Sequence, residues 1–275
     1  MTPKIDAVRL ARGVGRAWLV GGYAFLYLPI VALVVYSFND SPLPEVWAGF
    51  TLKWFGRLGA DTELVAALGL SMRVAFASAT AAVVLGLLAA WALVKLRVFR
   101  GRALFVGMIN APLLMPEVIV GLSLMLFLVS VQHALGFPRR GFATIWLGHV
   151  LLCLSYAAIV IEARLRELPA QLEEAALDLG AKPWQIFWLV TLPLIKQSLA
   201  SAWLLSFTLS LDDVVLSEFL SGPGATTLPM VIFSRARLGL SPSINAVATL
   251  IVVVVSLGVI AASLWLARQH KEQRP

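Results

Sequence analysis

Six long apolar stretches, separated by segments that contain most of the charged residues, constrain this 275-residue sequence more than any other feature. A bilayer core is about 30 Å thick, and a helix needs roughly 20 consecutive apolar residues to cross it. Each stretch reaches that length, so the pattern predicts an all-α polytopic membrane protein with one transmembrane domain over residues 1–275. The six predicted helices are 17–38, 66–94, 103–131, 142–161, 197–219 and 246–267.

The composition indicates lipid as the solvent of this chain. Hydrophobic residues make up 60% of it and charged residues 13%, whereas soluble domains have about 45–50% and about 25%. The single cysteine, Cys153, excludes a disulfide framework and a cysteine-based metal cluster. The net charge of +7 comes from basic residues scattered in short clusters between apolar segments. That distribution favours a role in membrane orientation and argues against nucleic-acid binding.

The distribution of Lys and Arg predicts how the helices are oriented. With the N-terminus inside, fifteen basic residues lie in cytoplasmic segments and six in external ones, while Arg73 lies within a helix. Both termini are therefore expected in the cytoplasm. The apolar stretch 17–38 is too long for the core of a signal peptide, so it is expected to remain as a membrane anchor.

Two predicted external loops, 39–63 and 221–244, are long enough to form structure of their own. The first contains Trp47 and Trp54, which suit a membrane interface, and the second begins with a Gly-Pro-Gly turn. Composition leaves two interpretations open. The loops only anchor helix ends, or they form a platform for an external partner.

The cytoplasmic segment 164–196 has the pattern of two short helices separated by a glycine. Good helix formers precede Gly180, which is a natural helix stop, and Pro183 suits the first turn of a second helix. Pro193 is then expected to end or kink that second helix. The spacing alone allows either a small-residue docking surface for another protein or a hairpin that only links two membrane helices.

The same segment resembles a known family motif. Glu174-Ala175-Ala176 is followed after three residues by Gly180, and after nine more by Val190-Thr191-Leu192-Pro193. This pattern resembles the EAA loop of permeases in binding-protein-dependent ABC importers, although that family prefers Ile where this chain has Val190. The resemblance extends over nearly the whole chain and is greatest to the polyamine branch, above all to the putrescine permeases. The other segments on which it rests are 47–49, 164–168, 206–213, 222–229 and 244–246.

The resemblance implies the type I importer permease fold, with a cytoplasmic coupling helix between the fourth and fifth membrane helices. It implies a bacterial inner-membrane complex with two copies of a cytoplasmic ATPase, a second permease that makes a heterodimer, and an external substrate-binding protein. The chain has no G-x-x-x-x-G-K-[ST] loop, so ATP and Mg²⁺ are expected on the ATPase and no cofactor on this chain. The residues expected to couple to the ATPase are Glu174, Ala175, Ala176, Gly180, Leu192 and Pro193.

Acidic residues in two predicted helices are candidates for the substrate path. Ionisable residues deep in a membrane segment are costly, and by default they indicate function. In the fifth helix, Ser206, Ser210, Asp213 and Ser217 recur at helical spacing, which places them on one face. Asn110 and Glu117 are seven residues apart in the third helix and are likewise expected on one face. With Asp212, the full candidate path set is Asp213, Asp212, Glu117, Ser210, Ser206, Ser217 and Asn110.

Helix geometry places the two sets of carboxylates at a similar depth. Asp213 is seventeen residues beyond Lys196, about 25 Å along a helix, and Glu117 is fifteen beyond Arg102, about 22 Å. A dicationic amine that loses water needs such anionic partners, and aromatic side chains could add cation–π contacts. The alternative left open is structural, with Asp212 or Glu117 paired to Arg73 or capping broken backbone near residue 116.

Other functional classes lack their motifs. A membrane-embedded enzyme would need G-x-S-x-G or H-E-x-x-H, and neither occurs, so the chain is not expected to be an enzyme. His133, His149 and His270 are scattered without metal-ligand spacing, so ordinary structural roles are expected for them. A passive channel would leave the EAA spacing unexplained. The predicted function is ATP-driven import of putrescine or spermidine by alternating access, and the alternative substrate is another small amine or an amino-acid-like compound.

Overall fold

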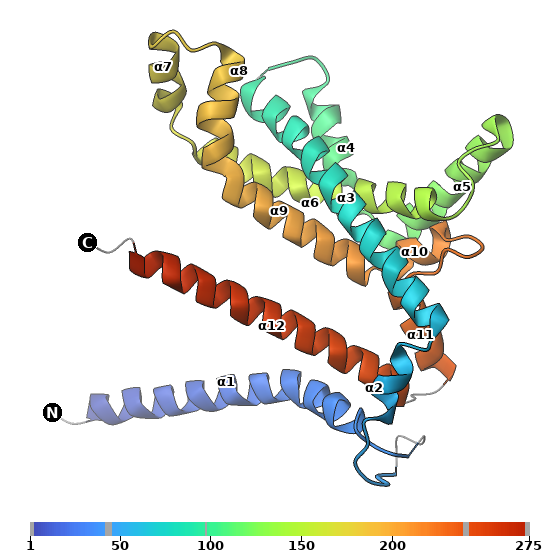
Figure 1. Ribbon diagram of the computed structural model, residues 1–275. Helices are drawn as coiled ribbons and strands as arrows, with labels where there is room; N and C mark the ends of the chain where they lie inside the picture. The colour runs from blue at the N-terminus through green and yellow to red at the C-terminus, as the bar shows by residue number, and fades with distance from the viewer. Residues whose placement is uncertain (1–2, 42–45, 97, 239–241, 273–275) are drawn as a thin grey trace. The chain divides into compact units, whose positions relative to one another are not determined.

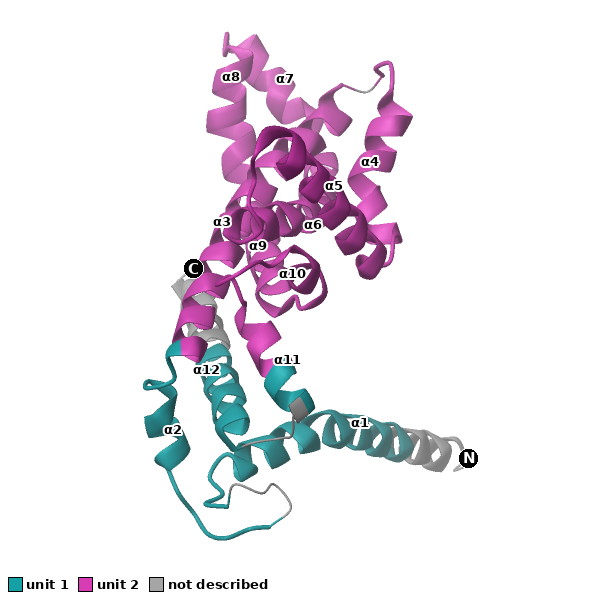
Figure 2. Ribbon diagram, turned by 90° about the vertical axis from the view of Figure 1, so that its right-hand side faces the viewer, with its two compact units in different colours: residues 1–62, 234–275 teal, residues 63–233 magenta. Residues whose placement is uncertain are grey.

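The computed structural model describes residues 3–41, 46–96, 98–238 and 242–272, and every regular element named in them is a helix. The predicted all-α fold class is therefore confirmed. The chain divides into two compact units, one made of residues 1–62 and 234–275 and the other of residues 63–233 (Figure 2).

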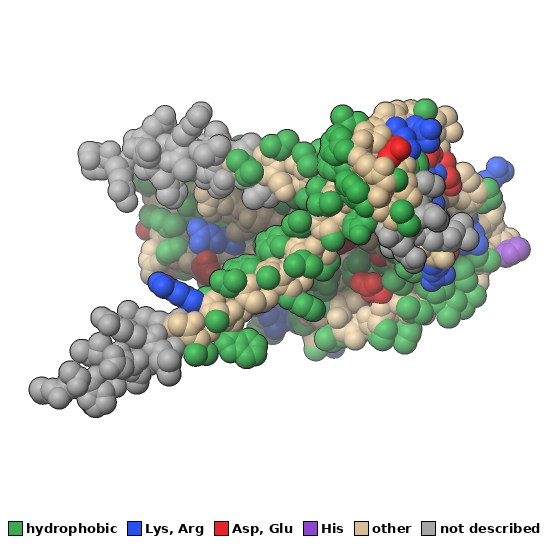
Figure 3. Space-filling model, turned by 90° about the horizontal axis from the view of Figure 1, so that it is seen from below, with side chains coloured by type: hydrophobic (Ala, Val, Ile, Leu, Met, Phe, Trp, Pro, Cys, Tyr) green, Lys and Arg blue, Asp and Glu red, His purple; other side chains and the backbone are tan. Residues whose placement is uncertain are grey.

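The first unit contains two long helices, α1 (Pro3–Tyr36) and α12 (Pro242–Glu272), which pack against one another, and the short α2 (Lys53–Leu58), which packs on α12. The described part of α1 leaves large apolar side chains uncovered, with Trp18 79% and Phe25 80% exposed. In Figure 3, hydrophobic side chains spread over much of the described surface seen in that view. Lipid covers such a surface favourably, whereas water does not.

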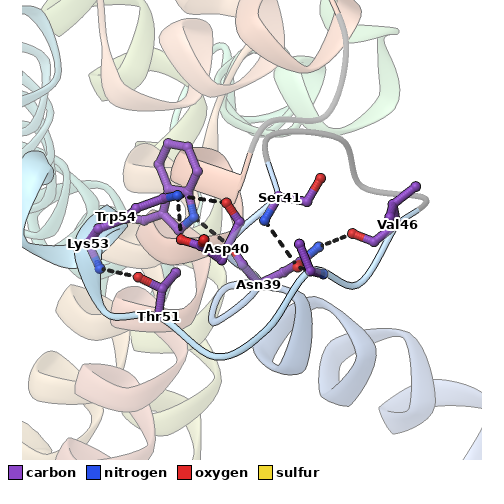
Figure 4. A network of polar contacts seen from close by, with 8 residues as sticks. Asn39, Asp40, Ser41, Val46, Thr51, Lys53 and Trp54 are labelled. Atoms are coloured by element: carbon purple, nitrogen blue, oxygen red, sulfur yellow. Dashed lines mark hydrogen bonds and ion pairs between the residues drawn. The ribbon is translucent and has the colours of Figure 1, made fainter.

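A buried asparagine organises the loop that follows α1 (Figure 4). The Nδ2 of Asn39 donates to the Val46 carbonyl over 2.8 Å, and the indole of Trp54 donates to the Asn39 carbonyl over 2.7 Å. Beside it, Lys53 forms an ion pair with Asp40. The hydrogen bond from Lys53 lowers the pKa of the Asp40 carboxyl, since it favours the charged form. The loop thus has structure of its own, as its length and tryptophans suggested.

The second unit is built around α6 (Phe142–Glu167). One core cluster joins α6 to α3 (Thr62–Lys95) and α9 (Leu192–Asp212), and another joins α6 to α3, α5 (Glu117–Leu135) and α10 (Val215–Leu220). The crossing helices of this unit are visible in Figure 1. The other elements are α4 (Arg102–Leu114), α7 (Ala170–Asp178), α8 (Pro183–Ile186), the π-helical turn η1 (Phe187–Thr191) and α11 (Leu228–Leu238), the last of which extends into the first unit.

Two predicted membrane helices are broken in the structure. The prediction of one helix over 103–131 is wrong, because α4 ends at Leu114 and α5 begins at Glu117. The break follows from Pro116, which lacks an N–H and forces Met115 into an extended conformation. The prediction of one helix over 197–219 is also wrong, since α9 ends at Asp212 and α10 begins at Val215. Asp213 between them is extended, with φ −67° and ψ 127°.

The other predicted helices exist with shifted ends: 17–38 lies in α1, 66–94 in α3, 142–161 in α6 and 246–267 in α12. Five helical segments among the described residues are long and apolar enough to cross a membrane: Gly13–Tyr36, Thr62–Lys95, Glu117–Leu135, Phe142–Glu167 and Pro183–Asp212. In α12 the described apolar stretch is Pro242–Leu257, and most side chains beyond it lie outside the described residues. The count of six spans therefore stays a prediction.

The contact of α3 with α6 generates a prediction about stability. A Cβ added at Gly86 would lie 2.9 Å from the Ala158 nitrogen and 3.0 Å from the Ala157 Cβ, whereas one at Gly107 of α4 would meet nothing within 4 Å. We expect Gly86→Ala to lower the free energy of unfolding by about 1–3 kcal/mol through overpacking. The matched change Gly107→Ala should stabilise its helix by about 0.5–1 kcal/mol. Thermal unfolding in detergent compares the two, and equal midpoints would contradict the close α3–α6 approach.

Candidate functional site

The segment with the EAA pattern begins with α7, which ends as its glycine predicts. Gly180 has a φ of +82°, in the left-handed region that favours glycine. Its N–H donates to the Leu177 carbonyl over 2.8 Å, and the Ala181 N–H donates to the Ala176 carbonyl over 3.0 Å. This pair of bonds is a Schellman motif, which satisfies the last carbonyls of the helix. The predicted helix stop at Gly180 is thus confirmed.

The second half of the segment is continuous with a membrane helix. Pro183 occupies the first turn of α8, and α8 passes through η1 into α9 without interruption. The π-helical turn lies directly before Pro193, whose ring cannot fit the ordinary helical hydrogen-bond pattern. Pro193 therefore changes the hydrogen-bond register there and does not end the helix. As a result α8, η1 and α9 form one continuous helical rod over residues 183–212.

Many side chains of α7 and of the turn that follows it are exposed. Glu174, Ala175 and Gly180 are exposed, and Leu179 is 89% exposed. Next to them Trp184 and Trp188 are also exposed. Leu192 is half-buried and Pro193 exposed, while Ala176 is half-buried on α7. The six predicted coupling residues thus lie on or beside an accessible surface of small and apolar side chains.

One acidic residue ties α7 to the membrane helices. Lys95, at the end of α3, forms an ion pair with Glu173 of α7. The same carboxylate accepts a hydrogen bond from the Thr191 hydroxyl of η1 over 3.2 Å. Lys95 also lies over the ring of Trp91, 5.3 Å from its centroid. Glu173 therefore connects α7 to α3 and to η1 through side-chain contacts, in addition to the chain connections at the two ends of α7.

At the other end of α9, a buried polar cluster occupies the helix break. His149 of α6 lies with Nδ1 2.6 Å from the Ser210 hydroxyl and Nε2 3.1 Å from the Ser217 hydroxyl. Its Nε2 is also 3.2 Å from the Asp213 carboxylate, and the two side chains are only 1% and 5% exposed. We call His149, Ser210, Asp213 and Ser217 the α6–α9–α10 cluster.

Asp213 also caps the short helix beyond the break. Its two carboxylate oxygens accept hydrogen bonds from the N–H groups of Leu216 and Ser217, over 3.2 Å and 2.8 Å. These N–H groups have no partner within α10, because they belong to its first turn. A negative charge at a helix N-terminus is also favoured by the helix dipole. One carboxylate thus holds both the start of α10 and the ring of His149.

The structure brings together only part of the predicted path set. The expected single helical face of Ser206, Ser210, Asp213 and Ser217 is wrong, because α9 ends before Asp213 and Ser217 belongs to α10. Ser210, Asp213 and Ser217 nevertheless meet at His149, and Ser206 is buried one turn away, where its carbonyl accepts a hydrogen bond from the Cys153 thiol over 3.3 Å.

The other path candidates are more accessible. Asp212, beside the cluster, is exposed, as is Glu117 in the first turn of α5. Asn110 donates to the Val106 carbonyl of its own helix over 3.0 Å. Asn110 and Glu117 do not share one helix face, since the break at Met115 and Pro116 separates them. Arg73, the alternative partner of the acids, donates instead to the Gly69 carbonyl of its own helix over 3.0 Å.

His149 is the residue that sequence reasoning underrated. The sequence predicted a structural role for His149 but did not identify Asp213 as its partner. The available signal was an ionisable side chain in the middle of an apolar helix, which normally has a specific partner within the protein. The two adjacent aspartates of another predicted helix were the natural candidates.

The only cysteine provides a reporter for the α6–α9–α10 cluster, because Cys153 lies one turn from His149 on α6 and is fully buried. We expect His149→Ala and Asp213→Ala to increase the rate at which a membrane-permeant maleimide modifies Cys153. Leaving a buried polar group without its hydrogen-bond partner typically costs about 1–3 kcal/mol, which raises the population of locally opened states. His133→Ala, at an exposed position of α5, is the control and should leave the rate unchanged. Unchanged rates in both cluster variants would contradict the packing described here.

The chain is similar to known proteins in sequence and in fold. Residues 82–273 match the family described as binding-protein-dependent transport system inner membrane component. The putrescine transport system permease protein PotI of Escherichia coli (strain K12) is 52% identical over 93% of this chain and 91% of its own length. The spermidine/putrescine transport system permease protein PotC of the same strain is 38% identical over 94% and 95%. Both are named as permease subunits and not as enzymes.

A solved structure supports the fold. A chain of the bacterial alginate ABC transporter, crystallised with an alginate pentasaccharide-bound periplasmic protein, matches with a TM-score of 0.71. It covers 97% of this chain and 96% of its own length at 17% identity, so it shows the fold alone. The apolar helices and the family match together indicate a multi-pass protein of the inner membrane. The chain belongs to the family of binding-protein-dependent transport system inner membrane components.

Proposed function

We propose that this chain is a permease subunit of an ATP-driven importer that moves putrescine, and also spermidine, across the inner membrane. The observation on which the substrate rests is its identity, over nearly the whole chain, to a permease named for putrescine transport. The chain has exposed carboxylates beside a helix break, which suits a cationic amine. Another small amine or an amino-acid-like compound is the alternative substrate.

The proposed partners are two copies of a cytoplasmic ATPase, a second and distinct permease, and an external substrate-binding protein. ATP and Mg²⁺ belong to the ATPase. The exposed surface of α7 and the turn at Gly180 supports ATPase docking there, because small residues let another chain approach closely. This assignment puts segment 164–196 and both termini in the cytoplasm, in agreement with the excess of Lys and Arg on that side.

The proposed substrate path passes the break between α9 and α10. Asp212 and Glu117 are exposed, so they are the carboxylates that can meet a polyamine in the described conformation. Asp213, Ser210 and Ser217 are buried with His149, and Ser206 is buried close by. These four residues act on the path by holding the break in place, and Asn110 contributes from α4.

The proposed mechanism is alternating access driven through α9. The rod from α8 through η1 to Asp212 begins beside the coupling surface and ends at the break. A helix transmits displacement along its axis with little loss because it is stiff. Closure of the ATPase pair would then move the break, which opens the path to one side of the membrane and closes it to the other.

The test is uptake into proteoliposomes that contain the whole complex with its binding protein. We expect uptake of labelled putrescine that requires ATP, with slower uptake of spermidine. Asp212→Asn should reduce putrescine uptake about tenfold, since loss of one favourable charge contact of about 1.4 kcal/mol gives that factor. Glu218→Gln, an equal loss of charge at an exposed site on α10, is the control and should have little effect.

Each outcome has a separate meaning. If a well-assembled complex transports neither polyamine but moves another amine, the substrate assignment is wrong. If uptake proceeds without ATP, the importer mechanism is wrong. If Asp212→Asn and Glu218→Gln behave alike, the path does not run past Asp212.

A further inference from the structure

A cavity of about 660 Å³ lies beside the coupling segment, away from the proposed path. Its walls come from the end of α3, the first residue of α4, the end of α6 and the beginning of α7. Charged residues dominate its polar lining, with Lys95, Arg102, Arg166 and Glu173, while Leu93 and Leu168 are among its apolar neighbours. Three cations therefore face one carboxylate.

Two of the three cations already have acidic partners. Lys95 is paired with Glu173. Arg166 donates to the Glu162 carboxylate through Nε over 3.0 Å and through Nη2 over 2.6 Å. These pairs leave the charge of Lys95 and Arg166 compensated.

Arg102 is different. Its Nε atom is buried and has no hydrogen-bond partner, and no ion pair involves its guanidinium among the residues that the structure describes. The guanidinium stays charged at any physiological pH. A half-buried charge without a counter-ion is unfavourable, and a buried donor without an acceptor adds to that cost. Arg102, which lines this cavity, therefore carries a positive charge that no acidic residue among the described ones compensates, and its buried Nε has no acceptor.

We propose that this cavity binds a phosphate anion through Arg102, either as the headgroup of an anionic lipid or as free phosphate. Arginine suits this ligand because its planar fork of donors matches phosphate oxygens. The position suits it as well, since basic pockets at the cytoplasmic ends of membrane helices are where lipid phosphates are available. The cavity also exceeds the volume of a phosphate, which leaves room for a glycerol headgroup.

The first residue of α7, Ala170, lies on the wall of the same cavity. A bound phosphate would therefore lie between the start of α4 and the start of α7, and the positive ends of both helix dipoles would add to the attraction. Through this contact the anion stabilises the position of α7 relative to α3 and α6. The inference is independent of the transported substrate and concerns the element proposed to meet the ATPase.

The experiment uses the whole complex, stripped of lipid in an uncharged detergent. Two probes are titrated separately and their binding is measured by equilibrium dialysis: short-chain phosphatidylglycerol and inorganic phosphate. We expect saturable binding that Arg102→Gln weakens about tenfold, because one charged hydrogen-bonding partner is lost. Arg100→Gln removes the same charge from an exposed neighbouring position and should change the affinity little. Sites on partner subunits contribute equally to every variant, so they cancel in the comparison.

The two probes distinguish the sources. Saturable, Arg102-dependent binding of the lipid alone identifies a headgroup site, and binding of inorganic phosphate with the same dependence identifies a site for the free anion. Equal weakening by Arg102→Gln and Arg100→Gln, or no saturable binding of either probe, overturns the proposal.

Hydrogen exchange of the wild-type complex provides a second measure that needs no variant to fold. We expect the bound probe to protect the first turns of α4 and α7. Unchanged exchange in both turns at saturating probe would likewise overturn the proposal.

Discussion

The buried carboxylate of Asp213, which satisfies backbone N–H groups at the start of α10 and contacts His149, organises the structure where α6, α9 and α10 meet. Lipid supplies no hydrogen bonds, so a helix that stops within the apolar region must satisfy its free backbone groups from nearby side chains. Asp213 does this for α10, and His149 in turn pairs with the carboxylate. The break between α9 and α10 is therefore held by charge and hydrogen bonds across three helices. Apolar packing alone would not hold a particular break at a particular residue.

The same constraint explains the opposite end of α9. There Glu173 compensates Lys95 and accepts a hydrogen bond from Thr191, so α7 is connected to α3 and η1 by polar contacts. Glu174 and Ala175 of α7 nevertheless remain exposed. The proposed docking of the ATPase at α7 needs both properties, because the ATPase must reach α7 and the movement of α7 must be passed on. The continuous rod from α8 to Asp212 connects this element to the α6–α9–α10 cluster.

Much of the fold could be predicted from the sequence, because local chemistry decides it. Apolar length predicted the membrane helices, and Gly180 predicted the end of α7. The break at Pro116 had a local signal in the proline itself, although the apolar run around it predicted one continuous helix. The break after Asp212 had no such local signal, since neither proline nor glycine lies there. Asp213 there accepts hydrogen bonds from the first turn of α10 and also contacts His149, sixty-four positions earlier in the sequence, which no local pattern reveals. The prediction that Asp213 and Ser217 share one helical face was wrong because α9 ends at Asp212. Both side chains nevertheless contact His149 in the α6–α9–α10 cluster.

In the proposed mechanism, movement of α7 and the turn at Gly180 reaches the break between α9 and α10 through α9. Cys153, beside the α6–α9–α10 cluster, can report this movement. The most direct measurement is the rate of Cys153 modification in the reconstituted complex, at rest and trapped with ATP and vanadate, read by mass spectrometry of the peptide that contains it. We predict that the rate differs severalfold between the two states, and that Gly180→Trp on the coupling surface removes the difference. Equal rates in both states of a complex that hydrolyses ATP and transports its substrate would contradict the account.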